Sequence, residues 1–212
     1  MCEVIVLFEG YSKILDEERM DANCSCVLIK GPRNVIVDTM TAWDRDRIIE
    51  ALSFHNQKPE DIDFVVCTHG HADHIGNNNL FLSAEHIVGS SFHRGSVFYE
   101  KNLQDAEYQL CEGVRVLPTP GHTHEDVSVL VETVVDGKKA TIVITGDLFE
   151  KEEDLKDSSI WEKLGIPELK KTQALNRFLV IKLADYIVPG HGKMFRVTEE
   201  TRRIIEEQIL DP

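Results

Sequence analysis

Long hydrophobic runs are missing from this sequence of 212 residues. The longest, residues 4–8 and 141–145, are much shorter than the roughly 20 apolar residues that a membrane-spanning helix needs. The N-terminus, MCEVIVLFEG, has no basic region ahead of an apolar stretch, so it predicts an opening strand rather than a signal peptide. We therefore expect no membrane partner, no secretion and a cytoplasmic or nuclear location.

Basic residues are scarce. Lysine and arginine together number 23 against 37 aspartates and glutamates, and the formal net charge is −14. Such a charge repels polyanions at long range, so it counts against a nucleic-acid partner held by an extended basic surface. Metal ions or local basic groups can still dominate the electrostatic field close to a site. A locally held nucleic acid therefore stays compatible with this composition.

Linkers and low-complexity segments are also missing. No Pro/Gly/Ser-rich stretch divides the chain, so we expect a single domain over residues 1–212. The five cysteines are an odd number, and without a secretion signal they predict reduced thiols. Cys24 and Cys26 lie two apart in a strand-like segment. We interpret them as buried structural thiols, with a two-cysteine metal clip as the weaker alternative.

Short apolar runs recur along the chain, with helical stretches between them. The expected strands are residues 4–8, 26–29, 34–37, 63–67, 114–117, 127–131, 140–144 and 185–188. The expected helices are residues 44–55, 167–183 and 198–210. Their apolar positions include Ile48, Ile49, Leu52, Phe54, Leu169, Ala174, Leu175, Phe178, Leu179 and Ile181. Strands and helices in both halves predict an α+β fold of two packed sheets with helices outside.

The most informative segment is Thr-His-Gly-His-Ala-Asp-His at residues 68–74, which follows an expected strand directly. His69 and His71 are two apart, so in an extended segment they can point the same way and bind one ion. Asp73 and His74 follow after the chain turns and can reach a second ion. Imidazole and carboxylate ligands together suit zinc, iron or manganese better than calcium or magnesium.

Three further segments each place a ligand-type residue after a small or turning residue at the end of a strand. They are Pro-Gly-His at 120–122, Thr-Gly-Asp at 145–147 and Pro-Gly-His at 189–191. Chance clustering of the nine histidines does not readily explain this combination with the 68–74 segment. The four segments together predict a metal centre.

This pattern resembles the signature of the metallo-β-lactamase superfamily, which is His-x-His-x-Asp-His followed by separate histidine, aspartate and histidine residues. The resemblance covers residues 38–191 and implies a four-layer αββα sandwich with the metals at one edge of the sheets. It implies a first metal ion held by His69, His71 and His122, a second held by Asp73, His74 and His191, and Asp147 bridging both. Asp38 would steady the histidine loop from outside the ligand set.

The resemblance implies a dinuclear metal-dependent hydrolase, with zinc as the first expectation for both ions and iron as the alternative. Two ions about 3.5–4 Å apart would lower the pKa of a shared water and supply hydroxide at neutral pH. That hydroxide would attack a carbonyl carbon or a phosphorus, and Asp73 would be the catalytic residue that fixes its direction. His124 and Lys193 could contact substrate, although a surface role is the simpler interpretation of both.

Within the superfamily, the sequence around the ligands resembles the metallo-β-lactamase domain-containing protein 1 family of animals. The shared segments are His-Gly-His-x-Asp-His-Ile-Gly-Asn at 69–77, Asp-Val-Ser-Val at 126–129, Gly-Asp-x-Phe-Glu at 146–150 and Val-Pro-Gly-His-Gly-x-x-Phe-Arg-Val at 188–197. This resemblance implies a homodimeric endoribonuclease that cleaves histone pre-mRNA 3′ ends, in cytosol and nucleus.

Two other functions stay open. A thioesterase or small-ester hydrolase of the glyoxalase II type would use the same metals without a basic channel. A non-catalytic metal-handling protein would bind the ions without turnover, but a complete ligand set that includes a bridging Asp147 favours catalysis. The best-known β-lactamases carry a cysteine where this chain has Asp147, so we do not expect antibiotic hydrolysis to be the native activity.

The expected homodimer needs an interface. Ile160, Trp161 and Leu164 are apolar residues in a charged neighbourhood, and an exposed apolar patch of this kind often marks one. Burial of Trp161 in the core of the monomer is an equal alternative.

Overall fold

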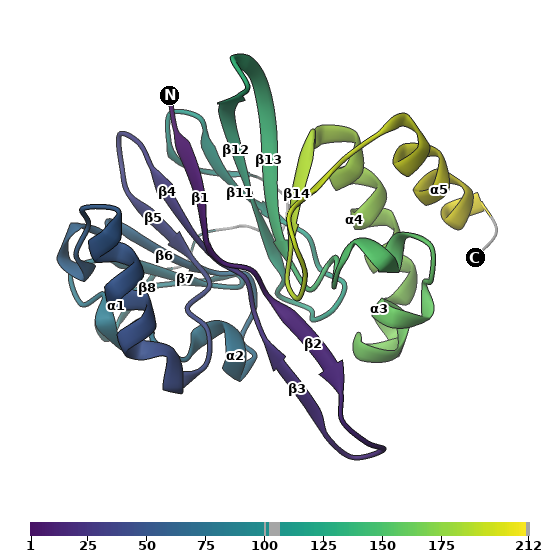
Figure 1. The fold of residues 1–212 in the computed structure, drawn as a ribbon, viewed down its shortest axis with the longest axis horizontal. Helices are drawn as coiled ribbons and strands as arrows, with labels where there is room; N and C mark the ends of the chain where they lie inside the picture. Colours follow the sequence, from purple (N-terminus) through teal and green to yellow (C-terminus); the bar gives the residue numbers. More distant parts are fainter. Residues whose placement is uncertain (100, 102–106, 211–212) are drawn as a thin grey trace.

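Two mixed β-sheets face each other in the computed structural model, and helices cover their outer faces (Figure 1). The structure describes residues 1–99, 101 and 107–210. This arrangement confirms the expected αββα sandwich. A single domain over residues 1–212 stays a prediction. Residues 100, 102–106, 211 and 212 of that range lie outside the described residues.

Within the described residues, the two sheets contain thirteen strands between them. In spatial order, the first sheet contains β1 (Glu3–Phe8), β4 (Cys26–Lys30), β5 (Val35–Val37), β6 (Phe64–Cys67), β7 (Glu85–Val88), β8 (Ser91–Arg94) and β9 (Val97–Tyr99). The second contains β10 (Tyr108–Cys111), β11 (Val114–Pro118), β12 (Val127–Val135), β13 (Lys138–Gly146), β14 (Tyr186–Pro189) and β15 (Phe195–Arg196). Parallel pairing joins β5, β6 and β7 in the first sheet and β13 and β14 in the second.

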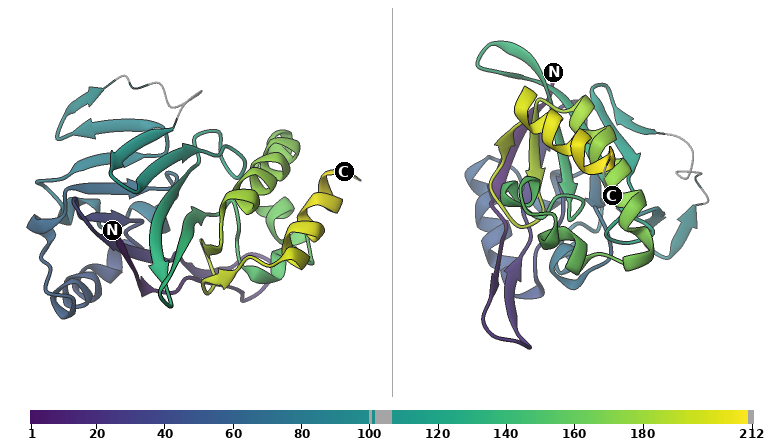
Figure 2. Two further views of the ribbon diagram at one scale, coloured as in Figure 1. Left: turned by 90° about the horizontal axis from the view of Figure 1, so that it is seen from above. Right: turned by 90° about the vertical axis from the view of Figure 1, so that its right-hand side faces the viewer.

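Helices lie outside the sheets, as the views in Figures 1 and 2 show. The α-helices are α1 (Arg45–Phe54), α2 (Ala72–Ile75), α3 (Ser159–Leu164), α4 (Lys170–Leu183) and α5 (Glu199–Leu210). The 3₁₀ turns are η1 (Ala42–Asp44), η2 (Pro59–Asp61), η3 (Asn78–Leu80), η4 (Glu152–Leu155) and η5 (Pro167–Leu169). None of the helices in the described ranges is long and apolar enough to span a bilayer.

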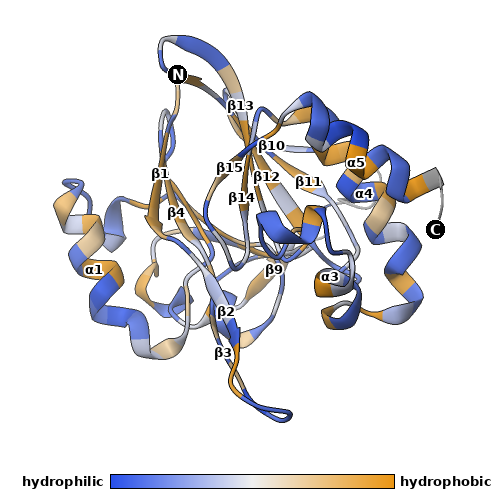
Figure 3. Cartoon of the chain, turned by 45° about the vertical axis from the view of Figure 1, so that its right-hand side comes forward, coloured by the Kyte–Doolittle hydropathy of each residue, from blue (hydrophilic) through white to orange (hydrophobic). Residues whose placement is uncertain are grey.

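Successive side chains of the central strands point to opposite faces of the sheet and form the core on both sides. In β4, Val27 and Ile29 pack between the sheets, whereas Cys26 and Leu28 point to the opposite face, beneath α1. In β12, Val129 faces the space between the sheets and Leu130 faces the side of α4. Because both faces of each sheet are covered, these strands carry apolar residues on both faces, although β12 also contains Ser128, Glu132 and Thr133. Figure 3 shows hydrophobic colouring along the central strands.

The apolar positions predicted to be buried in two of the helices were only partly correct. On α4, Leu175 and Leu179 are 52% and 56% exposed, whereas Gln173 and Arg177 are among its buried side chains. On α1, Phe54 is 82% exposed. Helical periodicity predicts that the most apolar face of a helix is buried. In α4, however, Gln173 and Arg177 are buried because they donate hydrogen bonds to backbone carbonyls of a loop.

The strands missing from the prediction are mostly short and half-exposed. They are β7, β8, β9, β10, β15 and the hairpin of β2 (Tyr11–Ile14) and β3 (Met20–Asn23). This hairpin projects from the sandwich (Figure 1). Its strands carry polar and exposed residues, so neither an apolar run nor a clean alternation marks them.

Trp161 is buried at 2% exposure, so it belongs to the core of the monomer. Of the three apolar residues proposed for an interface, Leu164 alone is classed as exposed. The expected homodimer stays a prediction, without the aromatic residue that suggested its location.

Candidate metal centre

Four loops converge at one edge of the sandwich. The loop after β6 carries His69, His71, Asp73 and His74, and α2 begins within it. The loops after β11, β13 and β14 carry His122, Asp147 and His191. Because β13 and β14 are parallel neighbours in the second sheet, their carboxyl ends place Asp147 and His191 at the same edge. The end of β6 in the facing first sheet brings the histidine loop to the same place.

The first group consists of three imidazoles and one carboxylate. His71 Nδ1 lies 2.9 Å from His69 Nε2 and 3.0 Å from His122 Nε2. Asp147 Oδ2 lies 3.6 Å from His69 Nε2 and 3.5 Å from His122 Nε2. All four ligand atoms lie within 4.8 Å of one another. Three imidazoles converging in this way form the donor set of a zinc site.

The second group adjoins the first through Asp147. Asp73 Oδ2 lies 3.9 Å from His74 Nε2 and 3.7 Å from His191 Nε2. Asp147 presents Oδ1 to His74 Nε2 and Oδ2 to His191 Nε2, both at 3.3 Å. The structure therefore brings together all seven residues that the sequence predicted, with Asp147 between the two groups.

The buried atoms of this site fit a cation. His74 Nε2 and Asp147 Oδ1 are buried and have no hydrogen-bond partner. Leaving such atoms unsatisfied costs roughly 1–3 kcal/mol each, and more where the group is charged. Divalent metal ions bound between nitrogen and carboxylate donors would satisfy both atoms, so the residues present fit the metals that the sequence implied.

Charge and burial set the protonation states of His69 and Asp147 in the candidate site. Burial and the neighbouring His74 hold the pKa of His69 well below its ordinary value, so its imidazole is neutral, the form that binds a metal. Burial opposes the charge of Asp147, but the imidazoles of His74 and His191 outweigh it and hold the pKa of Asp147 well below its ordinary value. Without metal, the site therefore pairs a neutral His69 with an ionised Asp147, and Asp147 in turn raises the pKa of His74 and of His191 against the effect of their burial.

Comparison with known proteins identifies the family. A model of the metallo-beta-lactamase superfamily matches residues 19–103. Metallo-beta-lactamase domain-containing protein 1 of Xenopus laevis is 41% identical over 197 residues, which are 92% of this chain and 81% of that protein. The chain belongs to the metallo-β-lactamase superfamily. Within it, the chain belongs to the domain-containing protein 1 family, and it is a metal-dependent hydrolase.

Solved structures of this superfamily share the fold at low sequence identity. Metallo-beta-lactamase SMB-1 bound to 2-mercaptoethanesulfonate matches with a TM-score of 0.63 and 15% identity, over 98% of this chain and 94% of that one. A mutant of B. thuringiensis AiiA with N-decanoyl-L-homoserine bound at its active site matches with a TM-score of 0.64 and 19% identity, over 90% and 92%. These likenesses establish the fold alone.

Outer partners orient two histidines of this superfamily site. Asp38 Oδ2 lies 2.9 Å from His74 Nδ1, and its other oxygen accepts a hydrogen bond from the backbone N–H of Thr68 at 2.7 Å. Because a carboxylate can only accept, His74 Nδ1 carries the proton and Nε2 is free for a metal. The contacts of Asp38 are those expected of a residue that steadies the histidine loop.

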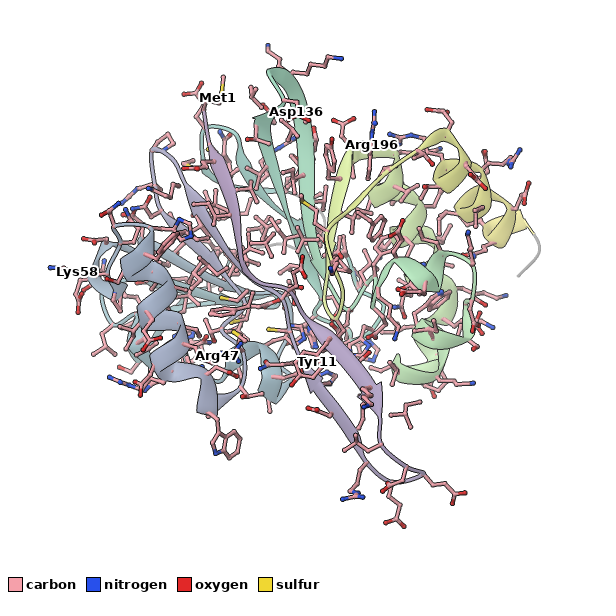
Figure 4. All side chains as sticks on the ribbon, in the orientation of Figure 1. Met1, Tyr11, Arg47, Lys58, Asp136 and Arg196 are labelled. Carbon is pink, nitrogen blue, oxygen red and sulfur yellow. The ribbon has the colours of Figure 1, made fainter. Side chains whose placement is uncertain are left out.

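His191 is oriented by the projecting hairpin. Its Nδ1 lies 3.1 Å from the carbonyl oxygen of Asn23 and 3.2 Å from that of Tyr11. Both are acceptors, so Nδ1–H donates to the backbone and Nε2 faces the second group. Tyr11 lies where the hairpin leaves the sandwich (Figure 4). The base of the hairpin, at Tyr11 and Asn23, therefore contributes to the candidate metal centre.

Two glycines allow the loops to approach so closely. A Cβ on Gly190 would lie 1.9 Å from Asp147 Oδ1. Gly146 has a φ of +50°, and its Cβ would lie 2.2 Å from Thr68 Oγ1. A small residue before each of these ligands is therefore a steric requirement of the site.

Helix α4 fixes the loop that carries Asp147. Gln173 donates to the carbonyl of Asp147 at 3.2 Å, and Arg177 donates to the carbonyl of Leu148 at 2.8 Å. Arg177 also forms a buried two-point ion pair with Asp154, at 3.0 and 2.7 Å. The sequence analysis missed these residues, because their role depends on how α4 packs and no local pattern reveals it.

The remaining candidates lie at the periphery. Lys193 is exposed and lies 3.9 Å from Glu9, as a solvated lysine would. His124 is exposed and lines a pocket of about 400 Å³ with Pro120 and Asp126. Neither belongs to the two ligand groups.

The two-cysteine metal clip finds no support in the contacts. Cys24, Cys26 and Cys67 are fully buried free thiols in the core outside the first sheet. Cys24 lies near Asp38 and His74 rather than forming a ligand group with Cys26.

The buried ion pair between Arg177 and Asp154 predicts a large effect of Arg177→Met. This change leaves the Asp154 carboxylate buried without its cation, so the free energy of unfolding should fall by about 3–5 kcal/mol in chemical denaturation. Arg33→Met is the matched control, because its ion pair with Asp63 is largely solvent-exposed and should be worth at most about 1 kcal/mol. Equal losses in the two variants would contradict the role given to the buried pair.

Proposed function

We propose that the chain binds two divalent transition-metal ions and hydrolyses its substrate between them. Zinc is our first assignment for both ions, and iron is the alternative. The proposed ligands are His69, His71 and His122 for the first ion, Asp73, His74 and His191 for the second, and Asp147 for both. The observation that carries the proposal is the convergence of seven ligand side chains, three of which (His74, His122 and Asp147) have a buried atom without a hydrogen-bond partner.

The chain's own residues would position the reaction. When bound, two ions would supply Lewis acidity and lower the pKa of a water molecule toward neutrality. Asp73 is 24% exposed at its side chain, so among the proposed carboxylate ligands it is the one within reach of solvent. It would accept a hydrogen bond from the attacking water and fix its direction. His71 is exposed, so substrate would approach from its side.

For the substrate, we propose single-stranded RNA cleaved internally, in particular at histone pre-mRNA 3′ ends. This assignment rests on the family resemblance and on the 41% identity to domain-containing protein 1 of Xenopus laevis. With a net charge of −14, affinity for RNA would come from the metals and a few local groups. A homodimeric assembly and a location in the cytosol and nucleus are part of the same proposal.

A thioester, lactone or small ester is the second candidate substrate. The acidic composition suits an uncharged acyl substrate better than a polyanion. The structural likeness to AiiA, which holds N-decanoyl-L-homoserine at its active site, supports the same candidate.

The metal proposal predicts up to two transition-metal ions per chain after reconstitution, measured by elemental analysis. Asp147→Asn should weaken the second site most, because the shared carboxylate loses its charge, while circular dichroism should show an intact fold. Asp46→Asn, which changes an exposed carboxylate, is the control and should keep both ions. Wild-type protein that holds at most one ion under saturating conditions would rule out the dinuclear centre.

The substrate proposal predicts metal-dependent internal cleavage of single-stranded RNA. Asp73→Asn, compared at matched metal loading, should abolish cleavage but bind RNA almost as tightly as the wild type. Since few phosphates would be neutralised, the affinity should fall by less than about 10-fold between 50 and 200 mM salt, whereas a protein with many phosphate contacts loses about 10³-fold or more.

The decisive comparison is the catalytic efficiency on RNA against that on thioesters and lactones. If an acyl substrate is preferred by orders of magnitude and RNA cleavage persists in Asp73→Asn, the cleavage comes from a contaminant. The esterase function would then replace the nuclease.

A further inference from the structure

Glu150 is a buried carboxylate beside the metal centre with no role so far. It lies three residues after Asp147 and is 1% exposed. Its backbone is held on both sides, because its N–H donates to Asp154 at 2.8 Å and its carbonyl accepts from the backbone N–H of His191 at 2.7 Å. These two bonds fix the position of the Glu150 backbone next to the metal centre.

The side chain points toward an equally unsatisfied atom. Glu150 Oε1 and His122 Nδ1 are both buried, and neither has a hydrogen-bond partner. The two atoms are 3.8 Å apart. One is an acceptor and the other becomes a donor once His122 uses its remaining nitrogen for a metal, so a small shift would satisfy both.

The other buried histidines of the site show what His122 lacks. His69 Nδ1 contacts Thr68 Oγ1 at 3.1 Å, His74 Nδ1 contacts Asp38, and His191 Nδ1 contacts backbone carbonyls. Each of these contacts leaves Nε2 directed into the ligand groups. His122 also directs Nε2 inward, 3.0 Å from His71 Nδ1, but nothing within hydrogen-bond distance receives its Nδ1.

We propose that Glu150 is the outer acceptor for His122, a positioning residue that holds the proton on Nδ1 and presents Nε2 to the first metal ion. A carboxylate in this place raises the basicity of the ligand and fixes the orientation of its ring. The inference rests on the proposed metal centre. It adds an eighth residue to that centre, and this residue acts on the first ion without ligating it.

Direct ligation by Glu150 is the competing interpretation. Its carboxylate lies within 4.8 Å of ligand atoms of Asp147 and His191. The second ion would already have four protein donors, as many as a closed zinc site takes. The approach to His122 Nδ1, an atom that no other group satisfies, therefore favours the outer role.

The test is Glu150→Gln, which keeps the shape of the side chain but removes its charge. The metal-free protein is titrated with zinc, and the dissociation constants of both ions are measured together with the melting temperature of the metal-free form. The affinity for the first ion should fall about 10–100-fold, with the second much less affected. Glu132→Gln, at a 64% exposed side chain, is the control and should change neither.

The melting temperature separates positioning from a structural role. Glu150 Oε1 is buried and has no partner in the metal-free fold, so Glu150→Gln should leave that melting temperature unchanged or raise it while the first-ion affinity falls. A merely structural Glu150 would lower both. Glu150→Asp keeps the charge but shortens the reach, and it should also lose affinity for the first ion.

Three outcomes would overturn the inference. Unchanged first-ion affinity in Glu150→Gln, with the wild type binding two ions, would remove the outer role but leave the metal centre intact. Loss confined to the second ion would make Glu150 a direct ligand. Failure of the wild type to bind zinc in the same titration would instead refute the proposed centre itself.

Discussion

The buried charge of Asp147 is the constraint on which the site depends. A carboxylate in a protein interior is stable only where positive charge or several donors face it. Here His69, His122, His74 and His191 all present a ring nitrogen to it within 3.6 Å. These imidazoles come from three loops on two sheets, so the sandwich must close before the charge is compensated. Metal ions bound between the same atoms would complete that compensation.

The surroundings of Asp147 are built to keep its loop in one position. Gly146 and Gly190 let the side chains of Thr68 and Asp147 approach to distances that a Cβ would forbid. Gln173 and Arg177 reach in from α4 to hold the backbone carbonyls of the loop. A polar face on a core helix is costly unless every group is paired, and here the donors are paired with loop carbonyls and Asp154. Helix α4 therefore buries polar side chains at these positions, and these side chains hold the loop that carries Asp147.

Sequence reasoning succeeded where local spacing carries the information. The segment His69–His74 and the residue pairs Gly146-Asp147 and Gly190-His191 could be recognised because strand ends and ligand spacing are local features. It failed where packing decides. Leu175 and Leu179 follow a helical apolar pattern yet face solvent, whereas Gln173 and Arg177 lie inside, because their partners are far away in the sequence. The hairpin was missed because its strands carry mostly exposed residues and no run of buried apolar ones.

Glu150 illustrates the boundary between these two cases. Its place in the shared segment Gly-Asp-x-Phe-Glu was visible in the sequence, but only the fold brings its carboxylate to within 3.8 Å of His122. With Glu150 in the proposed role, each buried histidine of the centre would face ligand atoms on one side and an outer acceptor on the other. The outer acceptors come from the first sheet, the hairpin and the second sheet in turn. The tautomers of the proposed ligands are therefore a property of the whole sandwich, and the chemistry of the metals cannot be separated from its assembly.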